Sequence, residues 1–270
     1  SDVLINAAVT STTGAINVIA GRGITQGGAG AGVFGTSGLL ATQSHDGQTL
    51  LGANTVGSFK GTNNGAGAIG NIQLNNTAAT LSITGVTNAG TDGGLTVDNS
   101  GTITTTGAIA TTGDILLTAK NTSSDINVLS DITVTHTAIA AKTLTLRADR
   151  DVVIGDGTKV LNVTAGSTGA LTMDFNSDRD KSGQGMVFFN STVATTVTVN
   201  TAGGSLNAHG GDTAIGRAVG YSEAGAPAAQ RRTGVNVGAG TAIDTGKGNV
   251  TMYGQGMAGA AGNTLSHNGV

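Results

Sequence analysis

The chain has 270 residues, of which only 11% are charged and 3% aromatic, with a formal net charge of −3 and no cysteine. A nearly neutral, slightly acidic chain lacks the basic surface that binds nucleic acid or an anionic membrane, and the lack of cysteine excludes disulfides, thiol catalysis and zinc–thiolate sites. No apolar run reaches the roughly 18 residues of a membrane-spanning helix. The 38% apolar content, with 46 glycines and one proline, predicts an ordered but thin core.

The first 70 residues predict short strands and loops. Apolar and polar residues already alternate over 3–5 and 16–19, which is the period of half-buried strands. Because strands are predicted from the first residues onward, we expect the chain to be a fragment cut from a longer array of stacked strands. Glycine is frequent from 21 to 70, and this part is predicted to form coils with longer corner loops, because glycine suits sharp turns.

Residues 71–175 form the most regular part, and 113–155 carries its clearest pattern. Ile115, Leu117, Ile126 and Val128 each alternate with polar or small residues, and the runs end at Gly, Asn, Asp or Ser. Such runs of three to six residues predict short strands with one buried face, and no helical pattern competes with them. The alternation resumes from Thr192 onward. Two loop excursions are predicted, at 176–190 and at 221–232, within a single segment spanning 1–270.

One unit recurs along the chain as Gly-x-apolar-x-apolar-x-small. Its copies stand at 14–20, 113–119, 204–210 and 248–254, with looser copies between them. Their first apolar residues, Ile72, Leu95, Ile115, Leu144, Leu171 and Val197, follow one another at intervals of 23, 20, 29, 27 and 26 residues. A drifting period of this size predicts a β-solenoid, in which each unit buries its apolar side only against its neighbours. At roughly 22 residues and about 4.8 Å per coil, we expect about 12 coils and a rod of about 60 Å.

Several phrases together resemble the shaft of filamentous haemagglutinin-like exoproteins, the secreted partners of two-partner secretion. These phrases are LLGANTVGSF, TLSITGVTNAG, GTITTTGAI with GDILLTA, KTLTLRADRDVVIGDG, MDFNSDRDKSGQG and IDTGKGNVTMYGQG. The resemblance implies an all-β, right-handed parallel β-helix of three sheets with Gly- and Asn-rich corner loops. It also implies export to the surface of a Gram-negative type bacterium and a part in attachment, aggregation or biofilm. The Asn-Pro-Asn-Gly type motif of the family's secretion domain is missing, and autotransporter passengers share the architecture.

The polar run with the clearest metal-binding pattern is a candidate calcium site. It consists of Asp174, Asn176, Asp178 and Asp180. Oxygen side chains two residues apart converge on a hard cation where the backbone curls. Arg179 stands where the helical calcium loop needs glycine, and Gly185 stands where it needs glutamate. The competing interpretation is a corner loop in which Arg179 pairs with the aspartates.

Other polar residues carry weaker signals of chemistry. Asp149, Asp151, Asp174 and Asp178 are the carboxylates from which a glycoside-cleaving pair would be drawn. A second charged cluster is more simply interpreted as salt-bridged loops on neighbouring coils. It consists of Arg147, Asp149, Arg150, Asp151 and Asp156. The histidines at 45, 136, 209 and 267 are scattered singly and lack metal-binding spacing.

The function expected from these observations is structural or adhesive, without catalysis or cofactor. The expected partners are glycans or proteins of a host or neighbouring cell, and further copies of the chain in a fibre, without nucleic acid or membrane insertion. The alternative is a β-helix polysaccharide lyase or glycoside hydrolase. The scarcity of aromatic residues for sugar stacking, with two Tyr and five Phe, disfavours that alternative.

Overall fold

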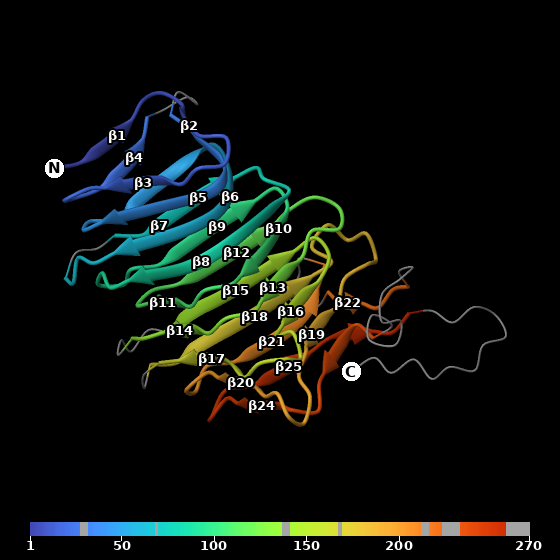
Figure 1. Ribbon diagram of the computed structural model, residues 1–270. Helices are drawn as coiled ribbons and strands as arrows, with labels where there is room; N and C mark the ends of the chain where they lie inside the picture. Colours follow the sequence, from blue (N-terminus) through green and yellow to red (C-terminus); the bar gives the residue numbers. More distant parts are fainter. Residues whose placement is uncertain are drawn as a thin grey trace.

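The computed structural model describes residues 1–27, 32–67, 70–136, 141–166, 169–211, 216–222 and 233–257. Its regular structure consists of strands, which Figure 1 shows stacked from the blue N-terminal coils to the orange and red C-terminal ones. The described residues contain no helix, and thus none with the length and apolar character needed to cross a bilayer.

Three faces make up each coil of the body. The first face contains β1 (Val3–Ile5), β4 (Ile24–Gln26), the start of β6 (Gln48–Asn63), β7 (Ile72–Asn76), β9 (Leu95–Asn99), β12 (Ile115–Ala119), β15 (Lys142–Ala148), β18 (Leu171–Ser177), β21 (Leu206–Gly210) and β25 (Val250–Met252). The second contains β2 (Val9–Thr10), the start of β5 (Phe34–Ser44), the middle of β6, the start of β8 (Thr80–Asn88), β10 (Thr102–Thr105), β13 (Ile126–Val128), β16 (Val152–Ile154), β19 (Val187–Phe189) and β23 (Val235–Val237). The third begins with β3 (Ile16–Ile19), continues through the later parts of β5, β6 and β8, and then contains β11 (Ile109–Thr111), β14 (Ile132–Val134), β17 (Leu161–Ala165), β20 (Val197–Asn200) and β24 (Thr241–Asp244).

All pairings within these faces are parallel, so the molecule is a parallel β-helix, as the alternation and the repeat predict. Ten strands of the first face stack in one register through Val3, Ile24, Gln48, Ile72, Leu95, Ile115, Leu144, Met173, Leu206 and Val250. Successive members of this column lie 21, 24, 24, 23, 20, 29, 29, 33 and 44 residues apart. The strands stay in register while the connecting loops lengthen toward the C-terminus.

The core lies inside the coils and consists of stacked aliphatic side chains. Ile115 and Leu144 pair across neighbouring coils and are fully buried, whereas Thr145, between two inward positions, points outward. Two aromatic rings, Phe175 and Phe189, add a tilted contact with centroids 6.0 Å apart. Each such burial removes apolar surface from water and stabilises the coil by about 1.5–3 kcal/mol per side chain.

Asparagines occupy the inward position where the first face turns into the second. Asn54, Asn76 and Asn99 stack in register and are fully buried. The Asn76 amide donates to Asn99 Oδ1 at 3.0 Å and to the Val56 carbonyl at 3.1 Å, and its Oδ1 accepts from the Val56 N–H at 2.8 Å. The column satisfies the backbone groups that the turn removes from the sheets.

Replacing Asn76 by leucine is expected to lower the free energy of unfolding by about 2–4 kcal/mol, because the substitution leaves buried backbone groups of Val56 without partners. Urea denaturation followed by circular dichroism measures the change. The matched control is Asn75→Leu on the same strand, where the side chain points outward, and it should stay within about 0.5 kcal/mol of wild type. Equal losses in both variants would contradict the role of the column.

The leading glycine has a steric cause in three of the four copies of the repeat. A Cβ on Gly113, Gly204 or Gly248 would lie 2.3, 2.2 or 1.7 Å from a carbonyl oxygen of a neighbouring coil. The glycine carbonyl in turn accepts a hydrogen bond from a threonine just before it, as in the 3.0 Å bond from Thr111 Oγ1 to Gly113. Thr201 and Thr245 make the same bond to Gly204 and Gly248.

Two expectations about the repeat were wrong. Leu171 pairs with Lys142, and it is Met173 that stacks on Leu144; Val197 belongs to the third face, where it stacks on Leu161. The predicted intervals that begin at Leu144 and at Leu171 therefore joined residues that do not stack on one another. The described coils are fewer and longer than the 12 expected. The glycine-rich part forms coils, as predicted, but instead of longer corner loops it contains the two longest strands, β5 and β6, which bend around corners of the helix.

The connection predicted at 176–190 is shorter at both ends. Asn176 and Ser177 complete β18, and Val187–Phe189 form β19, so the loop covers 178–186. Of the excursion predicted at 221–232, all but the first two residues lie outside the described residues. Next to it, β22 (Ala218–Val219) pairs with β26 (Gly254–Gln255) in a small parallel sheet of its own.

Candidate functional site

Most of the buried charge lies at the corner between the first and second faces. Loops 120–125, 149–151 and 178–186 occupy this corner on three successive coils, held by backbone bonds such as Arg150 N–H to Ser124 and Asp178 N–H to Arg150. We call it the charged corner and define it by Asp125, Asp149, Arg150, Asp151, Asp178 and Arg179.

Asp125 and Arg150 form a two-pronged ion pair between neighbouring coils. Arg150 Nε and Nη2 lie 2.7 and 2.6 Å from the two Asp125 oxygens, and both side chains are mostly buried, with 15% and 12% exposed. The Asp125 carboxylate also accepts the Asp151 N–H at 3.1 Å. Hydrogen bonding to Asp125 raises the pKa of Arg150 above its usual value, so the guanidinium stays charged.

Asp151 is fully buried and ties a distant segment to the corner. Its Oδ1 accepts the Met186 N–H at 2.9 Å, and its Oδ2 accepts the Tyr221 hydroxyl at 2.7 Å. Asp149, also buried, accepts the Asn121 N–H at 2.7 Å. These two carboxylates therefore hold the backbone of the neighbouring loops, and Asp151 also holds the side chain of Tyr221, 70 residues away in the sequence.

Arg179 pairs with Asp149, with 2.6 Å between Nη2 and Oδ1. This geometry agrees with the interpretation of the 174–180 run as a corner loop in which Arg179 pairs with an aspartate. The partner, however, comes from the preceding coil and not from the run itself.

The four calcium candidates have different surroundings. Asp174 lies on the outward side of β18, where its Oδ1 is 2.9 Å from His209 Nε2, and Asn176 is a buried residue of the same strand. Asp178, at φ 48°, accepts from Ser182 and from loop amides, while Asp180 is exposed and accepts the Ser182 N–H at 3.1 Å. Within the described ranges, no three acidic or histidine side chains are grouped so that they could hold a metal ion.

Asp178 is a carboxylate of the charged corner whose pKa burial perturbs. Burial raises the pKa of this carboxyl, against hydrogen bonds from the Gly183 and Gln184 amides and the Ser182 hydroxyl, which lower it. A raised pKa in the folded state means that the native protein binds the proton more tightly than the unfolded chain. Stability is therefore lost as pH rises from the unfolded pKa, near 4, through the folded one.

Asp178→Asn is expected to make the protein more stable than wild type at pH 7, with a difference that shrinks as pH falls toward 4. The asparagine carbonyl still accepts the loop N–H groups, and asparagine tolerates a positive φ. Urea denaturation at several pH values tests this, with Asp178→Ala as the comparison, because alanine removes the acceptor and should destabilise at every pH. A difference that widens on acidification would contradict the assignment.

The carboxylates proposed for glycoside cleavage are not equally open. Asp149, Asp151 and Asp178 are each less than a tenth exposed and bonded to loop groups, whereas Asp174 keeps 32% of its side chain exposed beside His209. The structure thus brings Asp149 and Asp151 to one loop, and leaves Asp174 on the outer surface of the first face.

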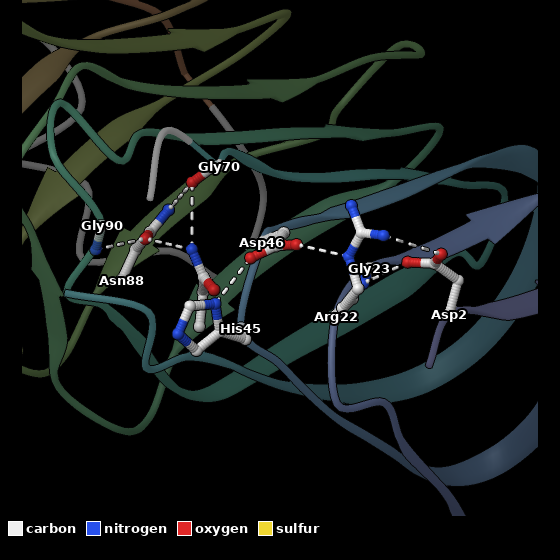
Figure 2. A network of polar contacts seen from close by, with 9 residues as sticks. Asp2, Arg22, Gly23, His45, Asp46, Gly70, Asn88 and Gly90 are labelled. Carbon is white, nitrogen blue, oxygen red and sulfur yellow. Dashed lines mark hydrogen bonds and ion pairs between the residues drawn. The ribbon is translucent and has the colours of Figure 1, made fainter. Parts of the chain in front are cut away.

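A second polar network lies where the third face leads into the first (Figure 2). There Arg22 lies between Asp2 and Asp46, 3.9 and 3.1 Å away, and His45 Nδ1 is 2.6 Å from Asp46. Hydrogen bonds from His45 and Arg22 lower the pKa of Asp46. These groups are largely exposed, so the pairs contribute little to stability. Beneath them, Asn63 donates to Asn88 at 2.9 Å inside the coil.

The remaining histidines have separate surroundings. His136 follows β14 of the third face, where its Nε2 is 3.1 Å from the Ala170 carbonyl, whereas His209 lies in β21 of the first face. His267 lies outside the described residues.

The sequence did not identify Asp125 as a member of the charged corner, nor Tyr221 as a partner of Asp151. Asp125 precedes the alternating run Ile126–Val128 and looks like an ordinary turn residue, and the Tyr221 partner is 70 residues away. The signal available in the sequence was the adjacent pair of opposite charges, Arg150 and Asp151. In a short loop between two buried strands, such charges need partners from other coils.

Searches with the chain found no matching family model, no matching curated protein and no matching solved structure. The parallel β-helix therefore rests on the strand pairings themselves, and the chemistry of the site rests on the contacts described above.

Proposed function

We propose that the chain is a non-catalytic structural and adhesive β-solenoid, a stretch of shaft from a bacterial cell-surface adhesin of the filamentous haemagglutinin-like kind. The observation that carries the proposal is the column of ten first-face strands in one register. One outward column of this face is mostly polar and consists of Leu4, Thr25, Thr49, Gln73, Thr96, Leu116, Thr145, Asp174, Asn207 and Thr251. Such a surface suits many weak contacts whose strength comes from multivalency.

The buried state of the corner carboxylates supports a role without catalysis. A general acid or nucleophile must reach its substrate, and Asp149, Asp151 and Asp178 are already bonded to the loops that they hold together. The proposed partners are glycans or proteins of other cells, at the outer surface of a Gram-negative type bacterium. Further copies of the chain, assembled into fibres, are a second proposed partner.

The test compares binding to cells at different display densities. The purified chain, coupled to beads at increasing density, is expected to hold bacterial or host cells steeply better as density rises, while the free monomer binds weakly. Beads carrying the chain after irreversible heat unfolding are the control. Binding that is independent of density would overturn the multivalent mechanism.

The enzymatic alternative has its own test. Incubation with a panel of acidic and neutral polysaccharides should release no reducing or unsaturated ends. Cleavage by the wild type that is lost in Asp174→Asn would replace the proposal by a β-helix hydrolase or lyase, since Asp174 is the open carboxylate among the four candidates.

A further inference from the structure

A small polar hollow opens on the charged corner, between loops 120–125, 149–151 and 178–186. Its volume is about 80 Å³, and it is lined by Thr122, Ser123, Asp149, Arg150, Ser182 and Gln184. A single water molecule needs roughly 10–15 Å³ of such space. The hollow therefore has room for several atoms of a small polar ligand.

The floor of the hollow is charged but balanced. Asp149 is held by the Asn121 N–H and by Arg179, and Arg150 is held by both oxygens of Asp125. Because each charge has its counter-ion, the floor presents hydrogen-bonding groups in fixed positions without favouring a cation or an anion.

The rim is neutral and open. Thr122, Ser123 and Gln184 are exposed, and their side chains make no hydrogen bond within the part of the chain that the structure describes. Two hydroxyls and one carboxamide supply both donors and acceptors at the mouth, next to the Ser182 hydroxyl.

The loops around the hollow are held in strained conformations. Asn121, Ser123, Asp178 and Lys181 have φ values of 84°, 69°, 48° and 59°, and they are four of the six non-glycine residues with positive φ in the described ranges. Each costs on the order of 1 kcal/mol and persists because the corner holds it in place. The hollow is thus preorganised and does not need to form on binding.

We propose that this hollow binds the hydroxyl-bearing edge of a neutral saccharide. Adjacent hydroxyls of a sugar ring donate and accept at once, as the rim does, and the balanced floor gives no advantage to a charged sugar. No aromatic side chain lines the hollow to stack on a sugar ring, so we expect a dissociation constant in the millimolar range. When many copies of the chain are displayed together, their combined binding is stronger through multivalency. The inference rests on the proposed function for its role in attachment, but the binding itself is tested without cells.

The experiment is saturation-transfer NMR of the whole chain with methyl glycosides of glucose, galactose and mannose, and with glucuronate as the charged comparison. At least one neutral glycoside should bind saturably, and glucuronate should bind more weakly. Ser123→Gly and Gln184→Ala should each weaken binding at least about threefold, the loss of one hydrogen bond. Ser123→Gly also relieves a positive φ, so the variant should fold at least as well as wild type.

Lys181→Gly is the matched control, because it relieves a positive φ in a loop beside the hollow, and the Lys181 side chain does not line the hollow. It should bind like wild type. Absence of saturable binding by every neutral glycoside, or equal weakening in Lys181→Gly, would overturn the site. If the sugars bind but density-dependent cell attachment fails, the saccharide site is supported and the adhesive function is contradicted. If attachment occurs without sugar binding, the adhesive function is supported and the saccharide site is contradicted.

Discussion

Asp125→Ala is expected to cost about 3–5 kcal/mol of unfolding free energy, because it removes the two-pronged partner of the mostly buried Arg150 guanidinium. Arg150 is 15% exposed and gives two hydrogen bonds to Asp125, and the same carboxylate accepts the Asp151 N–H. The substitution thus removes three hydrogen bonds and one ion pair from a corner that joins neighbouring coils. Urea denaturation followed by circular dichroism measures the loss.

A double-mutant cycle separates the pair from its surroundings. Arg150→Met fills the space of the arginine stem without the charge, and the double variant with Asp125→Ala should cost about 1–3 kcal/mol less than the sum of the single variants. The exposed pair Arg22 and Asp46, 67% and 34% exposed, serves as the control, where Asp46→Ala should cost far less than Asp125→Ala. Additive losses at Asp125 and Arg150 would show that the two groups do not stabilise each other.

The strands were predictable because their cause is local. Ile115 and Leu117 face the core and Leu116 between them faces outward, as two-residue periodicity requires. Which strand stacks on which was less predictable. A shift of two residues keeps every side chain on its side, so alternation cannot distinguish Leu171 from Met173 as the partner of Leu144. Loop length decides that register, and the loops lack periodicity.

The candidate site was predictable only in part, for a related reason. The charges at 149–151 and 174–180 were visible as clusters, and Arg179 does pair with an aspartate. Their partners come from other coils, so the pairs Asp125–Arg150 and Asp151–Tyr221 follow from register and from a long excursion. Local composition therefore located the corner but could not assign its bonds.

Gly204→Ala is expected to cost about 3 kcal/mol, because neighbouring coils approach closely at this leading glycine of the repeat. The new Cβ would lie 2.2 Å from the Leu171 carbonyl oxygen and 2.3 Å from its carbon, and backbone atoms cannot move aside as a flexible side chain would. The bond from Thr201 to the Gly204 carbonyl holds this turn in place, so the coil cannot shift without losing it. Thermal and urea unfolding of the purified variant measure the loss.

Gly183→Asn separates this crowding from the general cost of replacing a glycine. Gly183 has φ 81°, and nothing lies within 4 Å of a Cβ placed there. Asparagine accepts a positive φ more readily than most residues, so this substitution should cost no more than about 1 kcal/mol. If the two variants lost equal stability, backbone entropy would explain both, and the repeat glycine would not be a point of contact between coils. A larger loss at Gly204 is what close stacking of the coils requires.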